Sequence, residues 1–187
     1  NVYYSGGTIS GQGCGPTSIA DIVVDLAPKI TPKNTAKWME ANGCSCHGSG
    51  TYYNGMVKAL KHYGYTDAEQ LNYTSLYGKT NAAVVTDFLR KIKSGKYVGI
   101  ACMGKSIWTT SGHYIVVYKV TSDYIHIYDP YNKTTACEKT TRKNWEKYVK
   151  YLFIVKRPIA YGTTTKKIHK RKNAKALAKT KSLGKFD

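Results

Sequence analysis

The chain has 187 residues, of which 42% are hydrophobic, which suits one compact domain with a substantial core and leaves too little chain for a second full domain. No apolar run reaches the roughly 18 residues that a membrane-spanning helix requires, so the sequence predicts no membrane span. The formal net charge of +18 predicts a surface that attracts polyanions such as nucleic acid, anionic lipid or anionic cell-wall polymer.

The first predicted helix begins near Cys14, in the stretch GQGCGPTS at residues 11–18. Pro16 suits the first helical position, where a residue needs no N–H. Four apolar residues then follow the i, i+3, i+4, i+7 spacing of one helix face: Ile19, Ile22, Val23 and Leu26. This spacing predicts that Cys14 lies at a helix N-terminus.

Three more helices are predicted in the N-terminal half of the chain. In the first of them Thr31 is the cap, Pro32 is the first helical residue and Gly43 is the stop. The other two, over residues 54–64 and 81–95, each have one apolar face.

Beyond these helices the pattern changes to short runs rich in β-branched and aromatic residues. Strands are predicted at residues 97–103, 113–120, 124–129 and 151–157, with a helical stretch at 142–149. Helices first and strands second predict an α+β fold, in which an antiparallel sheet packs against the N-terminal helices.

The predicted domain covers residues 1–161, where the last apolar strand gives way to a basic tail at 162–187. Residues 163–187 alone carry a net charge of +8. A flexible, solvated tail or linker is the preferred interpretation of such a composition, and specific recognition of a polyanion is the alternative.

The five cysteines predict either one reactive thiol with up to two disulfides or five free thiols. They are Cys14, Cys44, Cys46, Cys102 and Cys137. The cluster CSCH at 44–47 resembles a zinc motif, but its cysteines are closer than the usual two-residue gap and no second pair lies nearby. No metal or other cofactor is therefore predicted.

Cys14 is the candidate nucleophile, because the unpaired N–H groups at a helix N-terminus favour the thiolate. Gly13 and Gly15 are assigned to substrate binding, since glycines leave room for a substrate backbone to approach the sulfur. The structural alternative is a small cysteine buried in a tight turn.

A cysteine nucleophile needs a base, and His113 is the best placed of the five histidines. It follows Gly112 directly and opens an apolar strand, so that its side chain and Gly112 are expected to face a cleft. We predict ordinary structural roles for His62 and His126. The other two histidines are His47, in a loop, and His169, in the basic tail.

Asp129 is the candidate carboxylate that orients the imidazole. If strands 113–120 and 124–129 form a hairpin through residues 121–123, position i pairs with about 244 − i. His113 then lies opposite Tyr131 and within diagonal reach of Asp129. The alternatives are a histidine at the rim of the sheet and a turn aspartate before proline.

Three motifs, taken together, resemble a known family. GCGPTSIADIV at 13–23, GHYIVVY at 112–118 and YDPYN at 128–132 are similar, in this order, to the nucleophile, base and acid motifs of papain-like double-glycine leader peptidases. Stand-alone relatives of that family include secreted bacterial proteins and wall hydrolases of phages. The resemblance spans residues 6–155 and implies a papain-like fold with Cys14, His113 and Asp129 as the triad.

The sequence departs from the papain-type pattern at the oxyanion donor. Such enzymes use a glutamine six residues before the cysteine, and here that position is Thr8. Gln12 is the nearest glutamine and is the candidate donor. A donor lost with an upstream segment and backbone N–H groups alone are the alternatives.

The leading hypothesis is a cysteine peptidase or amidase that cleaves peptidoglycan peptides through a thioester, as an endolysin does. We expect a monomer that acts outside the cell or at the cell wall, secreted or released by a phage, with anionic wall polymer as a further partner of its basic surface. One alternative is a double-glycine leader-peptide protease. Another is a non-catalytic basic module that binds wall polymer or nucleic acid.

Overall fold

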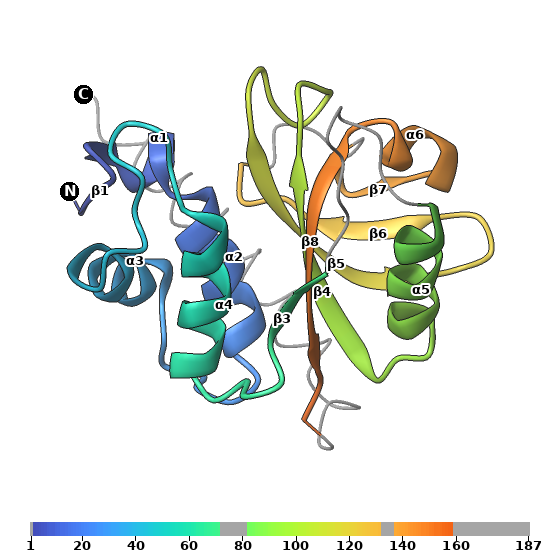
Figure 1. Ribbon diagram of the computed structural model, residues 1–187, viewed down its shortest axis with the longest axis horizontal. Coiled ribbons are helices and arrows are strands. Elements are labelled where there is room, and N and C mark those ends of the chain that lie inside the picture. Colours follow the sequence, from blue (N-terminus) through green and yellow to red (C-terminus); the bar gives the residue numbers. More distant parts are fainter. Residues whose placement is uncertain (1, 72–81, 132–136, 159–187) are drawn as a thin grey trace, which may run out of the picture. The chain divides into compact units, whose positions relative to one another are not determined.

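A six-stranded antiparallel sheet lies between two layers of helices in the computed structural model, which describes residues 2–71, 82–131 and 137–158 (Figure 1). The strand order is β3-β8-β4-β5-β6-β7. Asn1–Arg157 form one compact unit. The predicted tail, residues 162–187, and position 132 of the YDPYN motif lie outside the described residues.

The sheet is built from β3 (Glu69–Leu71), β4 (Tyr97–Met103), β5 (His113–Val120), β6 (Ile125–Tyr128), β7 (Lys139–Thr140) and β8 (Val149–Lys156). A separate hairpin joins β1 (Tyr3–Tyr4) to β2 (Gly7–Thr8). The helices are α1 (Ile9–Gln12), α2 (Cys14–Val23), α3 (Pro32–Ala41), α4 (Tyr53–His62), α5 (Ala82–Lys93) and α6 (Arg142–Glu146).

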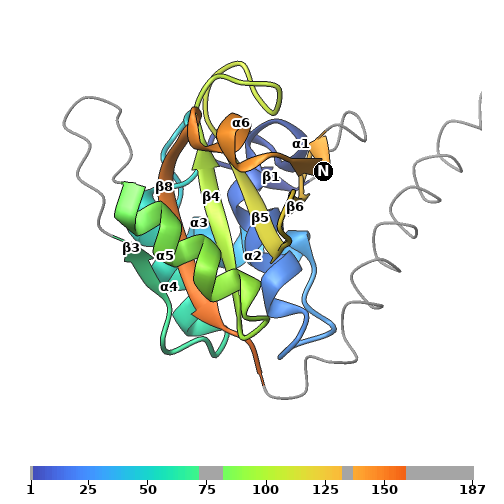
Figure 2. The ribbon, with the colours of Figure 1, turned by 90° about the vertical axis from the view of Figure 1, so that its right-hand side faces the viewer.

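Both faces of the sheet are covered, which explains why its central strands read as nearly continuous apolar runs. Helices α1–α4 lie on one side of the sheet and α5 and α6 on the other (Figures 1 and 2). On the α5 side, Phe88 and Trp145 join one buried cluster with alternate residues of β4, β5, β6 and β8. The residues between them, such as Tyr114 and Phe153, are buried as well and form the opposite face.

The predicted elements match the observed ones closely. The strands expected at 97–103 and 113–120 are found with those bounds, and the α+β fold with N-terminal helices on an antiparallel sheet is confirmed. The Thr31 side chain and Asn34 form the capping box that starts α3 at Pro32. The short elements α1, β1, β2, β3 and β7 are not predicted from the sequence, because segments of two to four residues show too little periodicity.

Two details of α2 differ from the prediction. The helix begins at Cys14 itself, so Pro16 is its third residue, a position in the first turn where an N–H is dispensable. It ends at Val23, so Leu26 lies beyond it and is 44% exposed. No helix within the described ranges is long and apolar enough to cross a membrane.

Candidate active site

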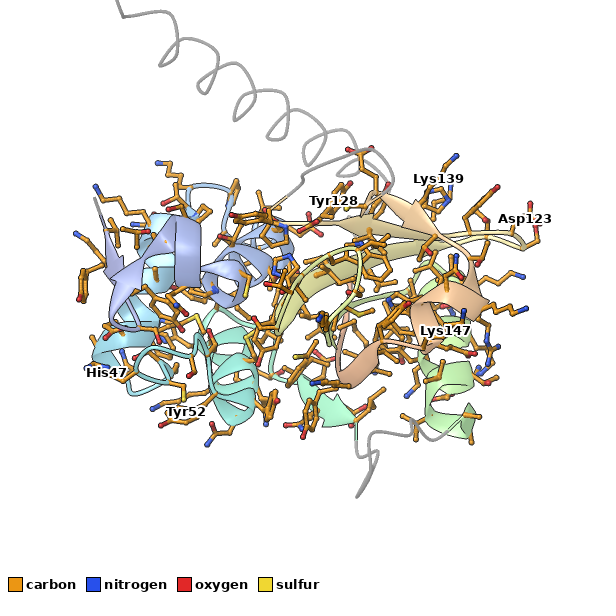
Figure 3. All side chains as sticks on the ribbon, turned by 90° about the horizontal axis from the view of Figure 1, so that it is seen from above. His47, Tyr52, Asp123, Tyr128, Lys139 and Lys147 are labelled. Carbon is orange, nitrogen blue, oxygen red and sulfur yellow. The ribbon has the colours of Figure 1, made fainter. Side chains whose placement is uncertain are left out.

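The β5–β6 hairpin carries two of the predicted site residues to one end of the sheet. Val116 pairs with Tyr128 and Val117 with Ile127, which is the register counted from the sequence. An irregularity between Val117 and Lys119 shifts the pairing by one position toward the turn. In Figure 3 the turn, marked by Asp123, points away from the N-terminal helices α1–α4, whereas Tyr128 lies nearer to them.

His113 and Asp129 form a hydrogen-bonded pair at this end of the sheet. His113 Nε2 lies 2.6 Å from Asp129 Oδ1, and the two residues are only 6% and 4% exposed. The same carboxylate oxygen accepts a hydrogen bond from the backbone N–H of Tyr131 at 2.8 Å. The carboxylate thereby fixes the orientation of the ring. Nε2 is the ring nitrogen that contacts Asp129, and Nδ1 is the one that remains to interact with another group.

The Cys14 thiol is close enough to His113 to raise the pKa of the ring, both by hydrogen bonding and by its charge. Burial lowers the pKa of His113, but the hydrogen bonds to Asp129 and Cys14 outweigh burial and raise the pKa to about 9. The ring is therefore protonated at neutral pH. An imidazolium beside a cysteine favours its thiolate, the form that attacks a carbonyl carbon.

Cys14 reaches His113 because it is the first residue of α2, in the layer that packs against β5. A hydrogen bond from Ser18 Oγ to the Tyr114 carbonyl, at 3.3 Å, joins the same helix and strand. The N-terminus of α2 and the first residue of β5 thus meet where the two layers come together. The structure brings together Cys14, His113 and Asp129, which lie far apart in the sequence.

The glycines beside Cys14 have a packing role. Gly13 and Gly15 are buried, and a Cβ would lie 2.4 Å from the Ile9 carbonyl oxygen at Gly13 and 2.3 Å from Thr51 Oγ1 at Gly15. A side chain is therefore excluded by the protein itself. Gly112 is exposed, and a Cβ there would have no neighbour within 4 Å among the described residues. Substrate contact by these glycines stays a prediction.

Gln12 is the last residue of α1 and half-buried, with its side chain over Gly7 and near Gly50. Thr8, at the usual position of the oxyanion donor, is exposed, and its hydroxyl pairs with Ser10 Oγ at 2.8 Å. Thr8 is thus engaged elsewhere. The donor role of Gln12 stays a prediction.

All five cysteines lie in the described ranges and none is in a disulfide, so the structure agrees with the alternative of five free thiols. Burial raises the pKa of Cys102 to about 12, and the charge of Cys14 acts in the same direction. Cys102 therefore stays a neutral thiol beside the site. In the part of the chain that the structure describes, no group of three His, Cys, Asp or Glu residues is arranged to hold a metal ion.

Two other histidines have the structural surroundings that the sequence predicts. The His62 ring stacks on Trp38 with the ring centroids 3.9 Å apart. His126 is half-buried on β6, and burial together with the charges of Lys119 and Lys139 lowers its pKa. His47 is exposed, and His169 lies outside the described residues.

Three buried side chains near Cys14 were not identified from the sequence. Tyr4, Thr51 and Tyr114 come from β1, from the loop before α4 and from β5, and they are joined by hydrogen bonds. Periodicity marks such residues only as buried. The one local signal is the position of Tyr114, directly after His113.

A family model and two solved structures, compared with this chain, agree on a peptidase fold of the C39 type. The model of a family described as Peptidase_C39 like matches residues 3–153. The fold is similar to that of the peptidase domain of Streptococcus ComA, a bi-functional ABC transporter involved in quorum sensing, with a TM-score of 0.54 and 17% identity over 81% of this chain and 95% of that one. It is also similar to a protein from Bacillus anthracis described as C39-like, with a TM-score of 0.51 and 15% identity over 77% and 88% of the two chains. No curated protein matches the sequence.

Proposed function

Since the chain belongs to the Peptidase_C39-like family and is a cysteine peptidase, we propose that it hydrolyses peptide amides with Cys14 as nucleophile, His113 as proton carrier and Asp129 as orienting carboxylate. One observation carries this assignment. The buried His113 ring is hydrogen-bonded to Asp129 and lies close enough to the Cys14 thiol for that thiol to raise its pKa, which is the arrangement that a thiol peptidase requires.

In the first half of the reaction the Cys14 thiolate attacks the carbonyl carbon of the substrate amide. The oxyanion that forms is stabilised by the Cys14 backbone N–H and by the side-chain amide of Gln12. The His113 imidazolium gives its proton to the leaving nitrogen, so the C–N bond breaks, an amine departs and a thioester remains.

In the second half His113 is neutral and acts as a base. It takes a proton from water while the water oxygen attacks the thioester carbonyl. When the C–S bond breaks, the acid product leaves and the thiolate–imidazolium pair is restored. Asp129 keeps its charge throughout, stabilising the imidazolium and holding its orientation.

We propose a peptide with a double-glycine cleavage site as the substrate. Membership of the C39-like family and the motifs shared with double-glycine leader peptidases support this choice. The family assignment also argues against the non-catalytic basic module.

Peptidoglycan is the second candidate substrate, and net charge favours it. A chain of net charge +18 is attracted to walls that carry anionic phosphate polymers. On this proposal the enzyme acts outside the cell, at the wall, as endolysins do.

One experiment tests the activity and separates the substrates. Wild type, Cys14→Ala and His126→Ala are incubated with double-glycine peptides and with purified peptidoglycan, and the products are identified by mass spectrometry. We expect cleavage by wild type and by His126→Ala, because the His113–Asp129 pair is intact in both. We expect no cleavage by Cys14→Ala. Cleavage that survives loss of the Cys14 sulfur would refute the proposed nucleophile.

A further inference from the structure

Three buried side chains form a hydrogen-bonded set behind Cys14. The Tyr114 hydroxyl donates to the Thr51 backbone oxygen at 3.0 Å. The Tyr4 hydroxyl lies 2.7 Å from Thr51 Oγ1. All three residues are at most 7% exposed, so these bonds form in an environment with little water.

This set joins the two layers that carry the reacting groups. Tyr114 follows His113 on β5, in the sheet. Thr51 lies against Gly15, the residue after Cys14, so closely that a Cβ on Gly15 would be 2.3 Å from Thr51 Oγ1. The bond from Tyr114 to Thr51 therefore connects the neighbour of the base to the neighbour of the nucleophile.

The Tyr114 bridge is independent of pH over the range in which a peptidase works. Burial raises the pKa of Tyr114 far above its ordinary value, and the charges of Cys102, Tyr53 and Cys14 act in the same direction. Burial also raises the pKa of Tyr4, although its hydrogen bond to Thr51 acts against this. Both hydroxyls stay protonated, and Tyr114 remains a donor.

We propose that Tyr114 is a positioning residue that sets the separation between the Cys14 sulfur and the His113 ring through its hydrogen bond to Thr51. The inference rests on the proposed roles of Cys14 and His113. A thiolate and an imidazolium stabilise each other most strongly at hydrogen-bond distance, and a shift of about 1 Å between reacting groups can lower a rate by a factor of about 10².

The test is the rate at which iodoacetamide alkylates Cys14, measured by mass spectrometry of the Cys14 peptide from pH 4 to 10. At low pH only a thiolate stabilised by its surroundings reacts, so this rate reports the Cys14–His113 pair without a substrate. In Tyr114→Phe we expect alkylation at pH 5 to be about 10-fold slower, which corresponds to the loss of one hydrogen bond.

Tyr65→Phe is the matched control. The Tyr65 hydroxyl is buried and donates to the Ile22 carbonyl, also at 3.0 Å, near the other end of α2. The same atom and the same kind of bond are therefore removed far along the helix from Cys14. We expect a similar loss of stability in urea, with the alkylation profile within about two-fold of wild type.

Equal alkylation profiles for Tyr114→Phe and Tyr65→Phe would overturn the positioning role. If Tyr114→Phe does not fold, Tyr4→Phe takes its place, because this substitution removes the hydrogen bond between the Tyr4 hydroxyl and Thr51 Oγ1. We then expect a smaller slowing in the same direction, and an unchanged profile would again overturn the role. Failure of the proposed function is a different result, in which wild-type Cys14 reacts at pH 5 no faster than Cys46.

Discussion

His113 lies between a carboxylate and a thiol, and both partners favour its charged form. Their hydrogen bonds hold the pKa of His113 at about 9 in spite of its burial. In the proposed mechanism His113 must be protonated when the leaving nitrogen departs. The protonated form is thus the dominant one at neutral pH.

Replacement of Asp129 by Asn tests this charge state. In the pH profile of kcat/KM for wild type, we expect the value to fall on the alkaline side near pH 9, because His113 loses its proton there. Without the carboxylate the pKa of His113 falls toward its ordinary value of about 6.5, so the limb moves to lower pH. We also expect kcat to fall, by up to roughly 10²-fold, because the ring is no longer held in place. An alkaline limb that stays in place in Asp129→Asn would contradict this account.

The same raised pKa predicts how stability depends on pH. The folded state binds the His113 proton more tightly than the unfolded state, so its contribution to stability is fully present below about pH 6.5. This contribution is lost as the pH rises through about 9. Urea unfolding between these values should show a steeper loss of stability in wild type than in His113→Gln. If stability falls equally steeply with pH in the two proteins, the result would argue against the raised pKa of His113.

At the scale of elements, α2 is the helix on which the site depends, and Gly15 shows how tightly it is packed. A methyl group at Gly15 would meet Thr51 Oγ1 at 2.3 Å, so Gly15→Ala must displace Thr51 or the helix. We expect a loss of about 1–3 kcal/mol in the free energy of unfolding, measured by urea denaturation. Gly112→Ala is the control, with a change within about 0.5 kcal/mol, because its Cβ would enter open space. Equal stabilities for the two variants would mean that Thr51 yields freely.

Much of this arrangement could be predicted from the sequence. Apolar periodicity and the caps located α3 and α5, and the hairpin count brought His113 close to Asp129 because strand pairing follows simple arithmetic. The contact between Cys14 and His113 could be expected only from the family resemblance. It depends on how α2 packs on β5, which no local pattern specifies.

The residues behind the site could not be predicted for the same reason. Thr51 lies 47 residues after Tyr4 and 63 residues before Tyr114, and the two tyrosine hydroxyls reach it only after the layers have packed. Propensity and periodicity describe a single element. The partners of a buried hydroxyl are decided by tertiary structure.

At the scale of the whole molecule, the site belongs to neither layer alone. The helices supply Cys14 and the sheet supplies His113 and Asp129, so activity requires that the two layers be packed together. The compact unit Asn1–Arg157 contains all three residues. Residues 163–187 together add +8 to the net charge, and none of them is among the proposed reacting groups.

A chain ended after residue 161 tests this division of roles. We expect it to fold and to keep its rate of Cys14 alkylation, while its binding to purified anionic wall polymer becomes weaker. Binding of the full chain should also fall as salt rises, because charge attraction is screened. Sedimentation with cell-wall preparations at two salt concentrations measures both effects. Loss of alkylation in the shortened chain would show that the tail is needed by the peptidase unit.

Within the described residues, the outer strands of the sheet, β3 and β7, have three and two residues. An open row of backbone N–H and C=O groups is what allows sheets of neighbouring molecules to join and aggregate, and strands this short offer almost none. The long central strands β4, β5 and β8 are shielded from such joining because each already has a partner on both sides. The short outer strands therefore lower the tendency of the sheet to join edge to edge with the sheet of a neighbouring molecule.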